Sequence, residues 1–80
     1  MNCIIASPQK TTHYNHITKT ILPTTQGQIN ILANHAEAFF LLKDGEVVLT
    51  KKSASQKRFL VKGGVCYVKN NQIILLLNNH

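Results

Sequence analysis

Turn residues recur at close intervals along the whole chain and leave no segment with a helical apolar stripe. β-branched and aromatic residues form short clusters between these turns. Many short strands at this spacing are typical of a sandwich or barrel. We therefore predict an all-β fold, a small β-sandwich of two mainly antiparallel sheets with about nine to ten short strands. The predicted strands are Asn2–Ala6, Lys10–Tyr14, His16–Leu22, Ile29–Leu32, Ala38–Leu42, Glu46–Lys51, Lys57–Val61, Val65–Lys69 and Gln72–Leu77.

Two turns have the composition of tight hairpins. Asp44-Gly45 and Asn70-Asn71 consist of residue types that tolerate the positive φ of two-residue hairpin turns. We predict an antiparallel meander over the second half of the chain, from residue 46 to residue 77. Its last strand, Ile73–Leu77, is apolar at every position and does not alternate. Both faces of that strand therefore need cover, one from the core and one from a partner or a further segment.

The 80 residues fit one domain, 1–80, with a thin core. Cys3 and Cys66 lie among aliphatic neighbours, so we expect buried free thiols and a reducing compartment. The N-terminus lacks a charged region and reaches a proline at Pro8 before any long apolar stretch. We therefore expect no signal peptide. The longest aliphatic run is too short to span a bilayer, and we expect a soluble protein.

The charge balance admits an anionic partner. Nine Lys and Arg against three Asp and Glu give a formal net charge of +6, as in many nucleic-acid-binding domains. Eight of the nine basic residues are lysines spread along the chain, which suits a solvated surface better than bidentate recognition. A small basic β-domain that binds RNA or single-stranded DNA remains the alternative function. A small-molecule-binding barrel is less favoured, because the chain is too short to enclose a pocket.

Aromatic placement argues against the nucleic-acid alternative. Domains of that class present aromatic side chains together on one exposed sheet face. Here no three aromatic residues occupy alternate positions of one strand. The aromatic residues are Tyr14, Phe39, Phe40, Phe59 and Tyr67.

No pattern in the sequence predicts catalysis, a metal or a cofactor. His13 and His16 form an H-x-x-H pair, but on a strand this spacing places the two side chains on opposite faces. A nucleophile built from Cys66 and His35 would need an accessible cysteine, whereas Cys66 is predicted to be buried. The Gly-Gly pair near residue 63 is not followed by the helix of a phosphate-binding loop. We expect no catalytic, metal-binding or cofactor-binding residue.

Two stretches resemble the epsilon subunit family of F-type ATP synthases. The first family signature is G-x-x-G-I-L-P-N-H-A, followed by an apolar strand that ends in a Lys-x-Gly turn. Residues that match it here are Gly27, Ile31, Leu32, Asn34, His35, Ala36, Lys43 and Gly45. The second signature is a V-S-G-G strand start, a short strand ending near asparagine, and an aliphatic strand. Its places are filled in order by Val61-Lys62-Gly63-Gly64-Val65, Asn70-Asn71 and Ile73–Leu76.

The resemblance runs from about Ile4 to Leu77 with several departures. Asn30 stands in place of the second glycine, and Lys62 in place of the serine. Ala33 and Glu37 replace the two prolines that flank the Asn-His-Ala triplet, which should make that turn less rigid. Family members continue into a pair of helices that carry nucleotide sensing and inhibition of hydrolysis. The sequence stops soon after the last strand, so neither function is expected of it.

The resemblance implies a non-catalytic central-stalk subunit that binds gamma and seats it on the c-ring, coupling proton translocation to ATP synthesis. It implies no contact with nucleic acid. The implied location is peripheral, on the cytoplasmic side of the bacterial inner membrane. By motif position, the c-ring contact is expected at Gln26, Gly27 and Gln28, and the gamma contact at Asn34, His35, Ala36 and Phe40.

Two further gamma contacts are expected from the last strand. Ile74 and Leu76 join the gamma contact when the odd-numbered residues of that strand point into the core. For His35 a second role stays open, that of a turn histidine that caps its own loop. For Phe39 and Phe40, strand geometry requires that the two rings face opposite sides of the sheet.

Overall fold

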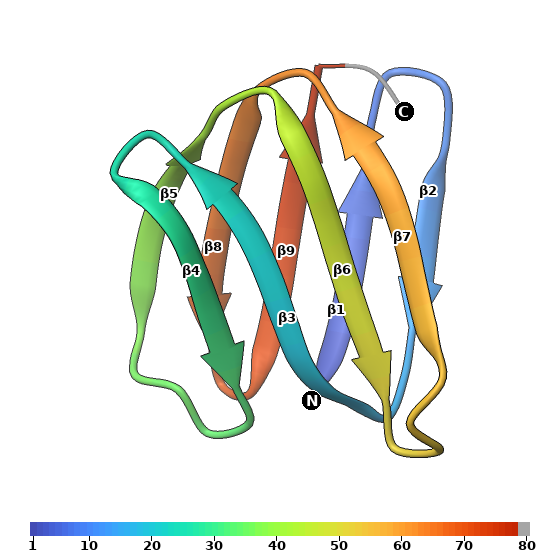
Figure 1. The fold of residues 1–80 in the computed structure, drawn as a ribbon. Coiled ribbons are helices and arrows are strands. Elements are labelled where there is room, and N and C mark those ends of the chain that lie inside the picture. Colours follow the sequence, from blue (N-terminus) through green and yellow to red (C-terminus); the bar gives the residue numbers. More distant parts are fainter. Residues whose placement is uncertain (79–80) are drawn as a thin grey trace.

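The computed structural model describes residues 1–78 as two packed layers of β-strands (Figure 1). The strands are β1 (Asn2–Ala6), β2 (Thr11–Tyr14), β3 (Ile17–Thr24), β4 (Gly27–Leu32), β5 (Ala38–Leu42), β6 (Gly45–Lys51), β7 (Gln56–Val61), β8 (Gly64–Lys69) and β9 (Gln72–Leu77). Residues 1–78 contain no helix, and so none that could cross a membrane. The all-β prediction is confirmed.

One layer has the strand order β4-β3-β6-β7 and the other has the order β2-β1-β9-β8-β5. The two layers join at one corner, where Thr24 of β3 pairs with Leu42 of β5. All pairings are antiparallel except that of β1 with β9, which is parallel. This arrangement confirms the predicted sandwich of mainly antiparallel sheets. The parallel pairing of β1 with β9 was not predicted from the sequence.

The hairpin prediction is right at one turn and wrong at the other. Asn70 and Asn71 have φ of 53° and 59° and join β8 to β9 as predicted. Asp44-Gly45 is no hairpin turn, because β5 and β6 lie in different layers and neither residue has a positive φ. The glycine serves packing there. A Cβ on Gly45 would lie 2.7 Å from the Cβ of Pro23.

The predicted meander over residues 46–77 is also wrong. β6 and β7 form a hairpin in one layer, while β8 and β9 form a hairpin in the other. The link between the hairpins crosses from layer to layer at Gly63 and Gly64, whose φ values are +72° and +131°. Residues that carry a side chain rarely adopt such φ values, so the glycine pair makes the crossover possible.

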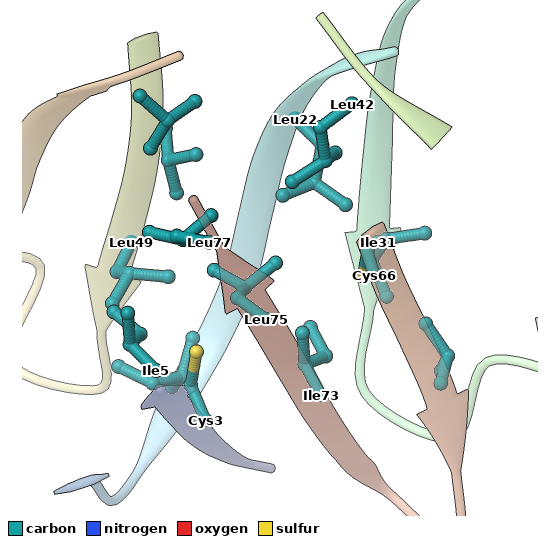
Figure 2. Close-up of a cluster of buried hydrophobic side chains, with 14 residues drawn as sticks. Cys3, Ile5, Leu22, Ile31, Leu42, Leu49, Cys66, Ile73, Leu75 and Leu77 are labelled. Atoms are coloured by element: carbon teal, nitrogen blue, oxygen red, sulfur yellow. The ribbon is translucent and has the colours of Figure 1, made fainter. Parts of the chain in front are cut away.

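The core lies between the layers and is almost entirely aliphatic (Figure 2). Its buried members are Cys3, Ile5, Ile17, Leu22, Ile31, Leu42, Val47, Leu49, Val61, Cys66, Val68, Ile73, Leu75 and Leu77. All three odd-numbered residues of Ile73–Leu77 belong to it. Ile74 and Leu76 therefore point away from the core, as the sequence analysis anticipated for an inward odd-numbered set.

Thr20 breaks the apolar pattern of the core. It is fully buried, and within residues 1–78 its Oγ1 has no hydrogen-bond partner. Its cross-strand neighbours, Ile31 and Leu49, are both core residues. A buried polar group without a partner costs about 1–3 kcal/mol. We expect Thr20→Val to raise the free energy of unfolding by about 1 kcal/mol in urea titrations, because valine keeps the shape and removes the hydroxyl.

Thr24→Val is the matched control, because Thr24 is also buried but its hydroxyl is fully used. Its Oγ1 donates to the carbonyl of Gly27 at 2.6 Å and accepts from the amide of Gln26 at 3.1 Å. Valine at position 24 should lower the free energy of unfolding. A loss of stability of similar size in Thr20→Val would show that the Thr20 hydroxyl is needed and would contradict the prediction.

Candidate interaction surface

The outer face of the β2-β1-β9-β8-β5 sheet carries two continuous rows of apolar and aromatic side chains. The register of the strands aligns the first row as Phe39, Tyr67, Ile74 and Ile4, and the second as Leu41, Val65, Leu76 and Ala6. We call these eight residues the outer apolar face. Single exposed apolar residues are ordinary on protein surfaces, whereas a contiguous set of this kind marks an interaction site.

Exposure is highest at three positions of this face. Phe39 is 61% exposed, Leu41 is 53% exposed and Leu76 is 50% exposed. The other five residues are partly exposed. The face therefore leaves several large apolar side chains in contact with water.

The outer face of the opposite sheet differs in character. One of its rows runs through Asn30, Ile21, Val48 and Arg58, mixing polar and apolar residues. Arg58 Nη1 forms an ion pair with Glu46 Oε1 at 3.0 Å. A polar residue and a charged residue stand at the two ends of this row, so it lacks the continuous apolar surface of the other sheet.

A polar cluster borders the outer apolar face where β5 begins. The hydroxyl of Tyr67 donates a hydrogen bond to Glu37 Oε2 at 2.6 Å, and Lys69 Nζ lies 3.7 Å from the same oxygen. The hydrogen bond to Glu37, followed by desolvation and the carboxylate charge, raises the pKa of Tyr67. Lys69, the basic residue next to the two rows, is thus already paired with a carboxylate.

The predicted gamma-contact loop lies beside this cluster. Asn34 has a φ of 65°, and its amide donates to Asn71 Oδ1 in the β8–β9 turn at 2.9 Å. His35 Nδ1 lies 2.7 Å from the carbonyl oxygen of Ala36, a contact that fits a turn histidine capping its own loop. All three loop residues are exposed, and the loop sits at the same end of the sandwich as the β8–β9 turn (Figure 1).

The predicted c-ring loop lies at the opposite end of the sandwich, in the turn between β3 and β4 (Figure 1). Gln26 and Gln28 are exposed, and Gly27 has a φ of +111°. The hydroxyl of Thr24 bonds to both sides of the turn, and the amide of Thr25 donates to the carbonyl of Leu41 at 3.0 Å. The Thr24 bonds hold the turn together, and the Thr25–Leu41 bond attaches it to the end of β5.

The structure separates the predicted gamma-contact residues into two groups. Ile74 and Leu76 lie on the outer apolar face, and the Asn-His-Ala loop lies at its border. Phe40, in contrast, packs against the core, while Phe39 takes the outward position. The sequence analysis required opposite sides for the two rings but selected Phe40 for the contact.

Sequence reasoning missed six members of the outer apolar face, Ile4, Ala6, Phe39, Leu41, Val65 and Tyr67. Strand alternation could have found some of them once an inward residue of β5 or β8 was known. The two residues of β1 depend on a parallel pairing between the two ends of the chain. No local signal in the sequence specifies such a pairing.

The thiols and histidines form no further site in the described part of the chain. Cys3 and Cys66 are buried free cysteines, and burial raises the pKa of each thiol to about 12. Both therefore stay protonated at neutral pH, and neither has the exposed, electropositive surroundings of a reactive cysteine. Within residues 1–78, no three His, Cys, Asp or Glu side chains gather in a group that could hold a metal ion.

Comparison with known sequences identifies relatives along nearly the whole chain. The profile of the family described as "ATP synthase, Delta/Epsilon chain, beta-sandwich domain" matches residues 1–79. The plastid ATP synthase epsilon chain of Prototheca wickerhamii is 39% identical over 64 residues, which cover 80% of this chain and 47% of the relative. The ATP synthase epsilon chain of Synechocystis sp. is 32% identical over 74 residues, covering 92% and 54%. The chain thus spans about half the length of the curated relatives it matches.

Comparison with solved structures supports the fold. A chain in the cryo-EM structure of the Tetrahymena thermophila mitochondrial ATP synthase central stalk and c-ring superposes with a TM-score of 0.82 at 15% identity, covering 99% of this chain and 63% of that one. A chain of the Euglena gracilis mitochondrial ATP synthase superposes with a TM-score of 0.86 at 13% identity, covering 94% and 48%. The superpositions agree with a β-sandwich, and the profile match over residues 1–79, with the curated relatives, establishes that the chain belongs to the ATP synthase delta/epsilon family and corresponds to its β-sandwich domain.

Proposed function

We propose that the chain is a non-catalytic subunit of the central stalk of a rotary F-type ATP synthase. It binds the gamma subunit and seats it on the c-ring, so that proton translocation is coupled to ATP synthesis. The proposed location is the periphery of the membrane that carries the complex, on the cytoplasmic side in a bacterial cell. Family membership supports the assignment to the ATP synthase complex. The outer apolar face is the observation that supports a protein partner.

The outer apolar face has the composition of an interface core. Its two rows contain aromatic and aliphatic residues and no charged residue, and depletion of charge is what distinguishes the centre of a protein interface. Moving one large aliphatic side chain from water into an apolar contact contributes roughly 1.5–3 kcal/mol. We assign this face to gamma, with Phe39 taking the contact first expected of Phe40.

The two predicted loops fit distinct parts of the same role. The Asn34–Ala36 loop borders the outer apolar face and supplies exposed polar groups of the kind found at an interface rim. The Gln26–Gln28 turn lies at the other end of the sandwich, where it is free to meet polar loops of the c-ring. One chain can then hold gamma by a sheet face and touch the ring by a turn.

Glutamate substitutions in the outward positions of β9 test the gamma assignment. We expect Ile74→Glu and Leu76→Glu to leave the circular dichroism spectrum unchanged, because neither side chain is part of the core. Each should weaken binding to purified gamma by at least about tenfold, since a charge would be buried at the centre of the contact. Biolayer interferometry with immobilised gamma gives the affinities.

Leu60→Glu is the matched control, because Leu60 is a 78% exposed leucine on the outer face of the other sheet. It introduces the same charge and should leave gamma binding unchanged. Gamma binding that survives glutamate at both positions of β9 would remove the outer apolar face from the interface. Equal losses in all three variants would indicate a general charge effect and would also overturn the assignment.

The nucleic-acid alternative gains one observation and loses another. Phe39 and Tyr67 are cross-strand neighbours on the outer apolar face, which is the kind of aromatic pair that stacks on bases. However, the adjacent Lys69 is paired with Glu37, and the two rows contain no Lys or Arg. Micromolar binding of a single-stranded oligonucleotide that weakens steeply with salt would favour this alternative.

A further inference from the structure

The loop between β4 and β5 is attached to the β8–β9 hairpin at both of its ends. At the first end, the backbone N–H of Asn34 donates a hydrogen bond to the side-chain Oδ1 of Asn71 at 2.9 Å. At the second end, the carboxylate of Glu37 accepts the hydroxyl proton of Tyr67 at 2.6 Å and lies 3.7 Å from Lys69 Nζ. Only two residues, at positions 35 and 36, lie between the attachments.

The backbone of this loop contains no proline that would restrict its conformation, so these attachments act on an otherwise unrestricted segment. Ala33 and Glu37 replace the two prolines that the resemblance places on either side of the Asn-His-Ala triplet, and proline would restrict the backbone through its fixed φ. Asn34 also holds a positive φ of 65°, which is uncommon outside glycine. Without side-chain contacts, an exposed loop of this composition would sample several conformations, and a partner would have to order it.

We propose that Glu37 is a positioning residue for the gamma contact: its carboxylate, held by Tyr67 and Lys69, fixes the His35–Ala36 segment beside the outer apolar face before gamma arrives. The inference rests on the proposed function, since it concerns how the gamma-binding face is organised. It assigns to Glu37 the restriction that a proline at the same position would supply.

The two partners of Glu37 contribute unequally. A hydrogen bond from a hydroxyl to a carboxylate is charge-assisted and stronger than a neutral one. The Lys69 contact is longer, and both of its side chains are more than half exposed, so solvent screens most of its energy. Tyr67 also belongs to the first row of the outer apolar face. The hydroxyl of Tyr67 thus links the loop directly to the surface that we assign to gamma.

We call the contacts of Glu37 with Tyr67 and Lys69 the clamp. The first experiment detects this clamp in the absence of gamma. The sequence has two tyrosines, so a Tyr14→Phe background leaves Tyr67 as the phenol that titrates in ultraviolet absorbance. The carboxylate of Glu37 accepts a hydrogen bond from the Tyr67 hydroxyl and so favours the protonated phenol. Glu37→Gln should therefore lower the titration midpoint of Tyr67 toward its ordinary pKa of 10.0. Lys69→Ala should change it less. A midpoint that Glu37→Gln leaves unchanged would show that the clamp does not form in solution and would overturn the inference.

The second experiment measures the consequence for gamma. Because gamma would then have to order the loop on binding, at a cost in entropy, we expect Glu37→Ala to weaken gamma binding about three- to tenfold. Glu37→Pro should restore most of the affinity by restricting the same segment. Tyr67→Phe keeps the ring and removes the hydroxyl. It should weaken gamma binding less in the Glu37→Ala background than in the unsubstituted chain, because the hydrogen bond is already absent there. Wild-type affinity in Glu37→Ala would contradict the positioning role.

The two experiments separate failure of the clamp from failure of the proposed function. If the unsubstituted chain does not bind gamma at all, the proposed function is wrong and the positioning role is wrong with it, whatever the titration shows. If the unsubstituted chain binds gamma and Glu37→Pro binds no better than Glu37→Ala, then restriction of the loop is not what Glu37 provides. That outcome rejects the inference and leaves the proposed function standing.

Discussion

Gly64→Ala is expected to leave the protein largely unfolded at 37 °C. Gly64 has a φ of +131°, a conformation open essentially only to glycine. A Cβ at this position would also overlap the carbonyl oxygen of Leu76 and lie 3.1 Å from the Cα of Leu77. Both neighbours are backbone atoms of β9, so relief requires the central β8–β9 pairing to shift. Strain and collision together should cost more than about 4 kcal/mol, a large part of the stability of a small domain.

Gly27→Ala is the control that isolates the strain from the collision. Gly27 also has a positive φ, +111°, but a Cβ there would meet no atom within 4 Å. We expect it to lower the free energy of unfolding by about 1–2 kcal/mol, from backbone strain alone. Urea titration followed by circular dichroism compares the two variants. Equal losses would mean that β9 accommodates the added methyl group, which would contradict the packing described for the Gly63–Gly64 crossover.

Local chemistry explains why the strands were predicted well and their connections less well. Strand positions follow from clusters of β-branched residues, and the Asn70-Asn71 turn follows from residue types that tolerate positive φ. Asp44-Gly45 has the same type of composition, but its glycine makes room for Pro23. Whether a glycine serves a turn or a close contact depends on which element lies opposite, and this information is absent from the local sequence.

The candidate site divides along the same line. Ile74 and Leu76 could be predicted because an unbroken aliphatic strand needs cover on both faces. The choice between Phe39 and Phe40 depends on which face of β5 meets the core, which is fixed by its pairing with β8. Ile4 joins the face through a parallel pairing between strands from opposite ends of the chain. Such long-range registers arise from the packing of the whole domain.

Leu75→Glu is expected to unfold the protein at neutral pH, whereas Leu76→Glu is expected to leave it folded. The two leucines are adjacent in β9, but Leu75 is fully buried in the core and Leu76 is 50% exposed. A carboxylate forced into the core loses its hydration and finds no cation there, since the core cluster is apolar apart from its two thiols. We expect a loss of more than about 4 kcal/mol at neutral pH. Reversed behaviour of the two variants would show that the register of β9 is inverted.

The pH dependence of this pair distinguishes buried charge from poor packing. Burial raises the pKa of the carboxyl introduced by Leu75→Glu above its unfolded value of about 4.3. The unfolded chain then releases its proton first, so the stability of this variant falls as pH rises above about 4. The carboxyl introduced by Leu76→Glu faces solvent and should produce no such fall. Urea titrations of both variants and the unsubstituted chain between about pH 4 and 7 give the comparison. A loss in Leu75→Glu that does not change over this range would come from the misfit of the side chain alone, because a charge on the inner face of β9 must make its cost depend on pH.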